Sequence, residues 1–390
     1  MTTRDLFTPD RLFCPGPTPV PRAALDAADS FASMYHRSDE FYKVSLRCSE
    51  LLKPVFGSST SPIILTSSGT GAMEAALVNL TSPGDKVVVV TGGKFGERWE
   101  KMAKAYQCAT EVIAVEWGTA PTPDQIVDVL AKNPDTKAVF LQANETSTGA
   151  YNPIQEIAAA IRKKWDGLLI VDCISSLGAH AMKMDDWQID AVVAGSQKGF
   201  GIPPGLAFIS LRASAWKKLS PRPRFYFDLE RERKGQAEGR SAWTPALSLM
   251  LSLHATLEIM SQDGIGAMLT HHDQLARAAR AATTAMGLQL FAKSCPSNAL
   301  TAITVPDGLD GSKLVKRLRQ RFGMYFAGGQ DQLKGKIVRF AHLGFVSRFD
   351  LLDGVAALEF ALREEGHKLD LGAGAKAAMT VLATQIGSDP

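Results

Sequence analysis

The sequence contains few cysteines, and nothing in their spacing would pair them. The five cysteines lie far apart without a CxxC pair, which argues against a disulfide framework and against a zinc site, and we predict no metal site. They are Cys14, Cys48, Cys108, Cys173 and Cys295. An odd number of cysteines, with an opening segment MTTRDLFTPDRLF that lacks an apolar signal core, predicts a location in the reducing cytoplasm.

Long apolar runs and a strong charge of one sign are also missing. No segment approaches the roughly 18 consecutive apolar residues of a membrane span. The net charge of +3 is too small and too evenly spread to predict nucleic acid or a membrane surface as a partner. The remaining composition, 45% hydrophobic and 21% charged, is typical of a soluble globular protein. A chain of 390 residues predicts two domains.

Short apolar runs alternate with helix-period segments from residue 62 onward. The predicted strands are residues 62–67, 86–93, 110–117, 138–144, 168–176, 191–196 and 206–211. The predicted helices between them are residues 71–80, 96–107, 122–133 and 154–165. Continuous apolar strands suit a sheet covered on both faces, so the fold class is α/β with a mostly parallel seven-stranded sheet.

The pattern changes after residue 211. Residues 222–245 are charged and aromatic with little periodicity, which predicts a solvated excursion. A long helical segment follows at 246–286, and then an α+β set of strands and helices. We therefore predict an N-terminal arm at 1–20, a large domain at 21–263 and a smaller C-terminal domain at 264–390. The tail at 373–390 is either one more helix or disordered.

Polar residues that follow strands are the candidates for chemistry, because ligands of open α/β sheets bind beyond the carboxyl ends of the strands. The stretch SGTGAMEAAL follows the first strand and begins a helix, where backbone N–H groups and the hydroxyls of Ser68 and Thr70 suit a phosphate. The same stretch fails as a dinucleotide fingerprint, because Glu74 stands where glycine or alanine is required.

Two further residues follow other strands of the same sheet. Asp172 could simply cap the next segment, and Lys198 could be an exposed turn lysine. With the phosphate cradle, however, they match the needs of pyridoxal 5'-phosphate. Lys198 would form the Schiff base with the aldehyde, Asp172 would keep the pyridine nitrogen protonated, and Phe95 in GGKFGERW would lie flat against the ring.

These residues stand within motifs that resemble the class V aminotransferases of the fold type I pyridoxal phosphate enzymes, especially alanine–glyoxylate, serine–pyruvate and serine–glyoxylate aminotransferases. The matching stretches are CPGPTPVP, MYHRSDEF, SGTGAMEAAL, GGKFGER, NETSTGAYNPI, VDCISSLGA, GSQKGFGIPPG, WTPALSL and IVRFAHLGF. They occur in family order up to about residue 365. The resemblance implies a large cofactor-binding domain, a smaller C-terminal domain and a homodimer.

The resemblance also implies roles for single residues. Gly69 and Thr70 would bind the phosphate through their amides, joined by Gln197, and Thr146 would reach the phenolic oxygen of the cofactor. Thr244 would contact the phosphate of the neighbouring subunit, so that two chains share each active site. The full cofactor-binding set is Lys198, Asp172, Ser68, Gly69, Thr70, Phe95, Thr146, Ile174, Gln197 and Thr244.

Arg339 and Gly16 are the candidates for substrate binding. Arg339 could be a strand-edge arginine with its head in water. The resemblance instead places the substrate α-carboxylate on its guanidinium, whose planar fork can grip both oxygens. The segment CPGPTPVP, which contains Gly16, would close over the same carboxylate or pack on the partner subunit.

The resemblance implies transfer of an amino group from a small amino acid to a 2-oxo acid. With one clear carboxylate-binding arginine, alanine or serine as donor and glyoxylate or pyruvate as acceptor fit best, and aspartate fits if Arg37 or a partner residue reaches its second carboxylate. One alternative is a lyase resembling the cysteine desulfurases, for which Cys295 would be the nucleophile. Another is a non-catalytic partner subunit that retains the fold.

Overall fold

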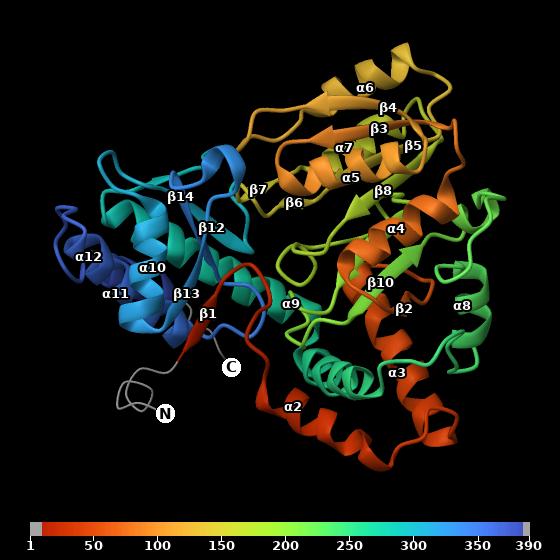
Figure 1. Ribbon diagram of the computed structural model, residues 1–390, viewed down its shortest axis with the longest axis horizontal. Helices are drawn as coiled ribbons and strands as arrows, with labels where there is room; N and C mark the ends of the chain where they lie inside the picture. The colour runs from red at the N-terminus through yellow and green to blue at the C-terminus, as the bar shows by residue number, and fades with distance from the viewer. Residues whose placement is uncertain (1–9, 385–390) are drawn as a thin grey trace.

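A seven-stranded sheet forms the centre of the large part of the computed structural model, which describes residues 10–384 (Figure 1). Its strands, in spatial order, are β2 (Ile63–Thr66), β10 (Leu206–Leu211), β9 (Ala191–Gly195), β8 (Leu168–Asp172), β5 (Ala138–Gln142), β3 (Lys86–Thr91) and β4 (Ala109–Ala114). All are parallel except β10, which runs antiparallel to both of its neighbours. The predicted sheet is therefore confirmed.

Helices cover both faces of this sheet, which explains why its strands are apolar throughout. Phe140 and Ile170 face a core that includes α4 (Gly69–Leu80) and α5 (Lys94–Ala105). The alternate residues Leu141 and Val171 face a second core. Its helices are α3 (Asp39–Phe56), α6 (Pro123–Lys132), α7 (Ile154–Ile161) and the first half of α9 (Leu247–Ala285). The four helices expected between the strands are thus confirmed.

A five-stranded sheet lies beside the larger one (Figure 1). Its strands, in spatial order, are β1 (Arg11–Phe13), β13 (Met324–Gly328), β14 (Ile337–Ala341), β12 (Leu300–Thr304) and β11 (Gln289–Leu290). Its helices are α10 (Gly311–Phe322), α11 (Arg348–Glu364) and α12 (Ala373–Ala383). The predicted tail is therefore helical as far as Ala383, and its end at 385–390 lies outside the described residues.

Smaller elements connect these parts. They are α2 (Arg22–Asp29), η1 (Ser30–Ser33), β6 (Asn144–Glu145), β7 (Ala150–Tyr151), η2 (Ala215–Lys218) and η3 (Asp331–Leu333). None of the helices within residues 10–384 is long and apolar enough to cross a membrane.

The long helix α9 joins the two parts of the molecule. It packs against α2 and α3 of the large part and against α12 of the small part. Gly264 breaks it with a left-handed φ of 74°, a conformation that glycine adopts without steric cost. The expected domain boundary at 263 and 264 falls at this bend and stays a prediction. Of the expected arm, residues 1–9 lie outside the described part, and β1 pairs in parallel with β13.

The prediction of a solvated excursion at 222–245 was wrong in one respect. The segment contains α8 (Leu229–Gln236), which buries Leu229, Glu232 and Gln236. The Gln236 amide accepts from Ile64 N at 2.9 Å and donates to Ile64 O at 2.7 Å, which pairs the outer edge of β2. The sequence does not show the apolar periodicity of a helix here, because two of the three buried residues of α8 are polar.

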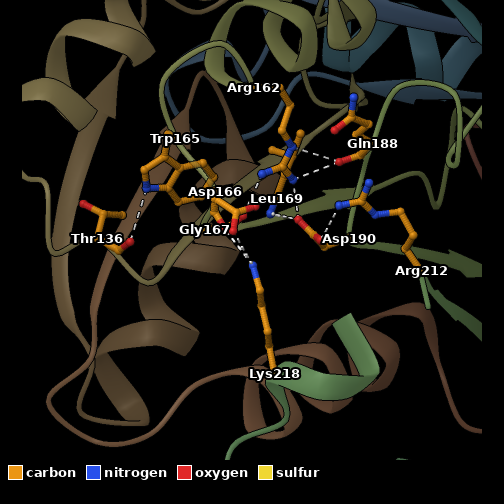
Figure 2. A network of polar contacts seen from close by, with 10 residues as sticks. All are labelled: Thr136, Arg162, Trp165, Asp166, Gly167, Leu169, Gln188, Asp190, Arg212 and Lys218. Carbon is orange, nitrogen blue, oxygen red and sulfur yellow. Dashed lines mark hydrogen bonds and ion pairs between the residues drawn. The ribbon is translucent and has the colours of Figure 1, made fainter. Parts of the chain in front are cut away.

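The amino ends of β8 and β9 are tied together by a polar network around Asp190, which precedes β9 (Figure 2). The carboxylate of Asp190 forms ion pairs with Arg162 and, at 3.2 Å, with Arg212, and it accepts from Leu169 N at 2.8 Å. Asp190 is 1% exposed. The network lies at the opposite end of the strands from Asp172, the last residue of β8, so it fixes the sheet without taking part in that edge.

Candidate active site

The predicted site residues follow strands whose carboxyl ends meet at one edge of the large sheet. Strands β3, β5, β8 and β9 are parallel neighbours. Strand β2 runs in the same direction, because β10 lies between β2 and β9 in the sheet and is antiparallel to both. Asp172 ends β8, Lys198 follows β9, and Phe95 lies in the first turn of α5 after β3. This edge is where parallel α/β sheets bind ligands.

Lys198 is covered by the N-terminal arm. Its Nζ donates to Pro15 O, and Thr18 Oγ1 donates to Lys198 O at 2.9 Å. Gly16 has a φ of 124°, a conformation that favours glycine, and a Cβ there would overlap the lysine amine, so glycine lets the arm lie directly against Lys198. Burial lowers the pKa of Lys198 to about 8, with Arg339 assisting and Asp172 opposing. The amine is therefore desolvated rather than exposed in a turn.

Asp172 is 5% exposed and has one strong local partner. Its Oδ1 accepts from Ile174 N at 2.8 Å, so the expected capping contact is present. Burial nevertheless raises the pKa of Asp172 to about 7, and the Ile174 amide, Arg98 and Lys198 oppose that rise. Asp172 and Lys198 thus interact electrostatically, and a cation placed against Asp172 would keep it ionised.

The N-terminus of α4 forms the predicted phosphate cradle. Ser68 caps the helix by accepting from Gly71 N at 3.4 Å, while the amides of Gly69 and Thr70 belong to the first turn. A Cβ at Gly69 would lie 2.7 Å from Cδ1 of Ile174, so glycine allows the helix start to pack on that side chain. The orphan N–H groups of a first turn are donors for an anion.

Phe95 is held by a carboxylate that the sequence did not draw attention to. The buried Glu145 accepts from Phe95 N at 3.1 Å and from Gly96 N at 3.0 Å, and also from Ser147 Oγ at 2.5 Å. Burial raises the pKa of Glu145, and these hydrogen bonds oppose the rise. Glu145 therefore fixes the start of α5 and with it the aromatic ring.

Arg339 is 7% exposed, so its head does not lie in water as one alternative required. Its Nη1 donates to Thr146 O at 3.1 Å and its Nε to Gly328 O at 3.0 Å. Burial lowers the pKa of Arg339 to about 10, with Glu145 opposing. The Thr146 hydroxyl pairs with Ser175 Oγ at 2.5 Å. Arg339 and Thr146 are thus brought together, although Arg339 lies in β14 of the smaller sheet and Thr146 lies in the turn after β6.

Arg98 is a further member of the site that we did not predict. Its Nη1 donates to Thr70 Oγ1 at 2.9 Å, and its Cζ lies 4.9 Å from the centroid of the Phe95 ring. Its charge acts on both Asp172 and Lys198. The spacing in the sequence could have found it, because residues three apart on a helix share a face and Phe95 was already a candidate.

Two predicted residues are not brought to this edge. Thr244 is exposed, and within residues 10–384 no hydrogen bond joins it to the rest of the site, so its contact with a neighbouring subunit stays a prediction. The Cys295 thiol donates to Gly118 O at 3.7 Å, and burial raises its pKa. A packed thiol of this kind is a poor nucleophile.

The residues fit pyridoxal 5'-phosphate. In the described part of the chain, the amide oxygens Gln197 Oε1 and Asn144 Oδ1 are buried without a hydrogen-bond donor, which is costly unless a bound molecule supplies one. Gln197 Oε1 lies beside Gly195, and the backbone of Gly195 lies close to Gly69 in the first turn of α4. A cradle of amides, an aromatic ring, a buried carboxylate and a desolvated amine would hold the phosphate, ring, ring nitrogen and aldehyde, respectively.

Comparisons with known proteins agree with this geometry. The family model described as aminotransferase class-V matches residues 11–343. The soluble hydrogenase 42 kDa subunit of Anabaena cylindrica is 40% identical over 95% of this chain and 98% of the relative. The serine–glyoxylate aminotransferase of Methylorubrum extorquens is 35% identical over 96% of each chain. Among solved structures, the aspartate aminotransferase of subgroup IV from Thermus thermophilus has a TM-score of 0.85 and 33% identity over 91% of this chain and 99% of that chain.

Proposed function

The chain belongs to the class-V aminotransferase family, and from this membership we propose that it moves an amino group from a small amino acid to a 2-oxo acid with bound pyridoxal 5'-phosphate. We propose alanine, serine or aspartate as donor and glyoxylate or pyruvate as acceptor. We also propose a cytoplasmic homodimer with shared active sites, and the division into an arm, a large domain and a small domain at residues 20 and 263.

One observation carries the proposal: a desolvated lysine, Lys198, lies within electrostatic range of a buried aspartate, Asp172, and a buried arginine, Arg339. The cofactor supplies an electrophilic aldehyde and an electron-accepting ring when it is bound. Lys198 would bind the aldehyde and then, as a free amine, remove the proton from the substrate Cα. Asp172 would hold the ring nitrogen protonated. Arg339 would orient the substrate through its α-carboxylate.

A partner subunit without catalysis is the second candidate, because the Anabaena relative is named as a hydrogenase subunit. A scaffold has no physical need for Lys198, whose desolvation is unfavourable for its charged form. The desulfurase-like alternative would need a mobile thiol, and Cys295 is packed against Gly118.

The proposed function predicts a donor-dependent colour change. The purified protein is expected to carry the visible absorbance of bound pyridoxal phosphate, which alanine or serine bleaches and glyoxylate or pyruvate restores.

Lys198→Ala should lower turnover by at least about 100-fold, because it removes the general base. Arg339→Lys should raise KM for the donor about tenfold or more, because lysine lacks the planar fork.

The measurement is a screen of alanine, serine and aspartate against glyoxylate, pyruvate and 2-oxoglutarate, read as product keto acid. Unchanged turnover in Lys198→Ala would refute the proposed chemistry. Release of sulfide from cysteine would favour the lyase, and wild-type protein that binds no cofactor and converts no donor would favour the partner subunit.

A further inference from the structure

Arg98 is a cation at the candidate active site that has no acidic partner within the described residues. It lies on α5, where Lys94 pairs with Glu97 at 2.9 Å and Lys104 pairs with Glu100 at 2.5 Å. Within residues 10–384, no carboxylate forms an ion pair with Arg98, whose Nη1 donates to a neutral hydroxyl, Thr70 Oγ1. A guanidinium stays charged at any physiological pH and has five N–H donors, so most of its donors remain for another acceptor.

The contact with Thr70 sets the direction of the neighbouring donors. Because Thr70 Oγ1 accepts from Arg98, the Thr70 hydroxyl hydrogen is left to donate elsewhere. The amides of Gly69 and Thr70 lie in the same first turn of α4, where Ser68 takes the amide of Gly71 alone. Guanidinium, hydroxyl and helix amides therefore form one group of donors at the predicted phosphate cradle.

Charge balance at this cradle requires more than the helix. A helix N-terminus is equivalent to roughly half a positive charge, whereas a phosphate monoester carries about −1.5 to −2 at neutral pH. The two other cations of the site have different partners: Lys198 donates to Pro15 O and Arg339 donates to Thr146 O and Gly328 O. Of these three cations, Arg98 is the one that donates a hydrogen bond to a residue in the first turn of α4, Thr70.

We propose that Arg98 binds the phosphate group of the cofactor directly, as a charged anchor beside Thr70. This inference rests on the proposed function, since it assumes that pyridoxal phosphate occupies the site. The competing explanation is a positioning role, in which Arg98 only holds Phe95 through the contact of its guanidinium with the ring, 4.9 Å from Cζ to the ring centroid.

The two explanations differ in how binding depends on the phosphate. The test is a titration of the apoprotein with pyridoxal phosphate and with pyridoxal, which lacks the phosphate, followed by the absorbance of the bound aldehyde. Direct phosphate binding predicts that Arg98→Gln raises the Kd for pyridoxal phosphate about 10- to 100-fold. The Kd for pyridoxal should change by less than about twofold, within the usual effect of a surface substitution.

Equal weakening of both ligands would overturn the proposal in favour of a positioning role. An unchanged Kd for pyridoxal phosphate would overturn it as well, because Arg98 would then contribute nothing to binding. Wild-type apoprotein that binds neither ligand would instead refute the proposed function, so the two failures are distinguishable. Inorganic phosphate gives an independent readout: it should compete with pyridoxal phosphate in the wild type and compete less in Arg98→Gln. Equal competition in both proteins would contradict the proposal.

Arg233→Gln is the matched control, because Arg233 is an exposed cation whose Cζ lies 4.5 Å from the centroid of the Trp216 ring. Both residues lie near the amino end of β2, whereas the cradle follows its carboxyl end. The control variant loses the same charge and the same kind of ring contact and should leave both Kd values unchanged. If Arg98→Gln does not fold, Arg98→Lys keeps the charge but loses the fork, and it should weaken pyridoxal phosphate binding selectively to a smaller extent.

Discussion

At the scale of single residues, the environment of Lys198 matters more than its identity. The arm residues Pro15 and Gly16 lie against the amine, and this desolvation is the largest cause of its lowered pKa. Cys14 and Asp172 oppose the shift, while Arg339 and Arg98 add to it. The two arginines therefore have a second effect beside any binding role: they keep the nearby amine partly neutral, which is the nucleophilic form.

This environment predicts the pH dependence of the amine. A lysine whose pKa is lowered from 10.5 to about 8 loses its proton at a lower pH than an exposed lysine, so the fraction of neutral amine increases as the pH rises through 8. Pyridoxal added to the apoprotein and trapped with borohydride should label Lys198 with a midpoint near pH 8. Peptide mapping measures the label, and surface lysines in the same digest report the ordinary value of about 10.4.

Arg339→Gln provides the control for the cause of this shift. Removing a nearby cation that favours the neutral amine should move the Lys198 midpoint to higher pH. A wild-type midpoint near that of the surface lysines would show that the arm does not desolvate the amine.

At the scale of elements, the sequence predicted most of the large sheet because each strand shows its burial directly. The run at Ala138–Gln142 is buried on both faces, and the helix start at Thr122 is marked by a capping box with Gln125. The helix α8 was missed because Glu232 and Gln236 are buried polar residues, and local periodicity cannot show that they find partners.

The same reason limits prediction of the candidate site. Lys198 and Asp172 could be found because each follows a strand, and strand ends converge in any parallel sheet. Glu145 could not be found in this way, because its role depends on a contact with a residue 50 positions away. The spacing from Phe95 could have indicated Arg98, but its contact with Thr70, 28 positions away, could not be predicted. Arg339 could be named from the motif, but its contact with Thr146 depends on how the smaller sheet packs against the turn after β6.

The Asp190 network predicts a stability effect that is separate from catalysis. Asp190→Asn would leave the guanidinium groups of Arg162 and Arg212 without their carboxylate in a buried setting (Figure 2). Breaking such a pair typically costs about 3–5 kcal/mol, so the midpoint of urea unfolding should fall clearly. Cofactor affinity below the transition should stay unchanged, because the network lies at the other end of the strands.

Asp166→Asn is the matched control for this variant. Asp166 pairs with Lys218 at 3.4 Å in the same region, but its side chain is 95% exposed, so its loss should leave the unfolding midpoint close to that of the wild type. Equal effects of the two substitutions would mean that burial does not decide the strength of the Asp190 contacts.

At the scale of the whole molecule, the surroundings of Thr244 support the proposal of a shared active site. The ring of the neighbouring Trp243 stacks with that of Tyr226, with centroids 5.7 Å apart. The Phe225 ring also contacts Trp243, with centroids 4.9 Å apart. Phe225 is 73% exposed and Tyr226 43% exposed. Adjacent exposed aromatic rings are typical of interfaces between proteins, and a second copy of the chain is the partner that would bring Thr244 to a phosphate.

A shared site predicts complementation between two defective chains. Lys198→Ala removes the amine, and Thr244→Val removes the hydroxyl proposed to reach the neighbouring phosphate, so each homodimer should be inactive or weak at limiting cofactor. In a dimer of one chain of each kind, one site carries both defects and the other carries neither. Unfolding and refolding an equal mixture should therefore recover about one quarter of the wild-type sites. Turnover at limiting pyridoxal phosphate measures this recovery. If Thr244 contacted the phosphate of its own chain instead, no mixed dimer would contain an intact site. Activity equal to the mean of the two parent variants would therefore contradict the shared site.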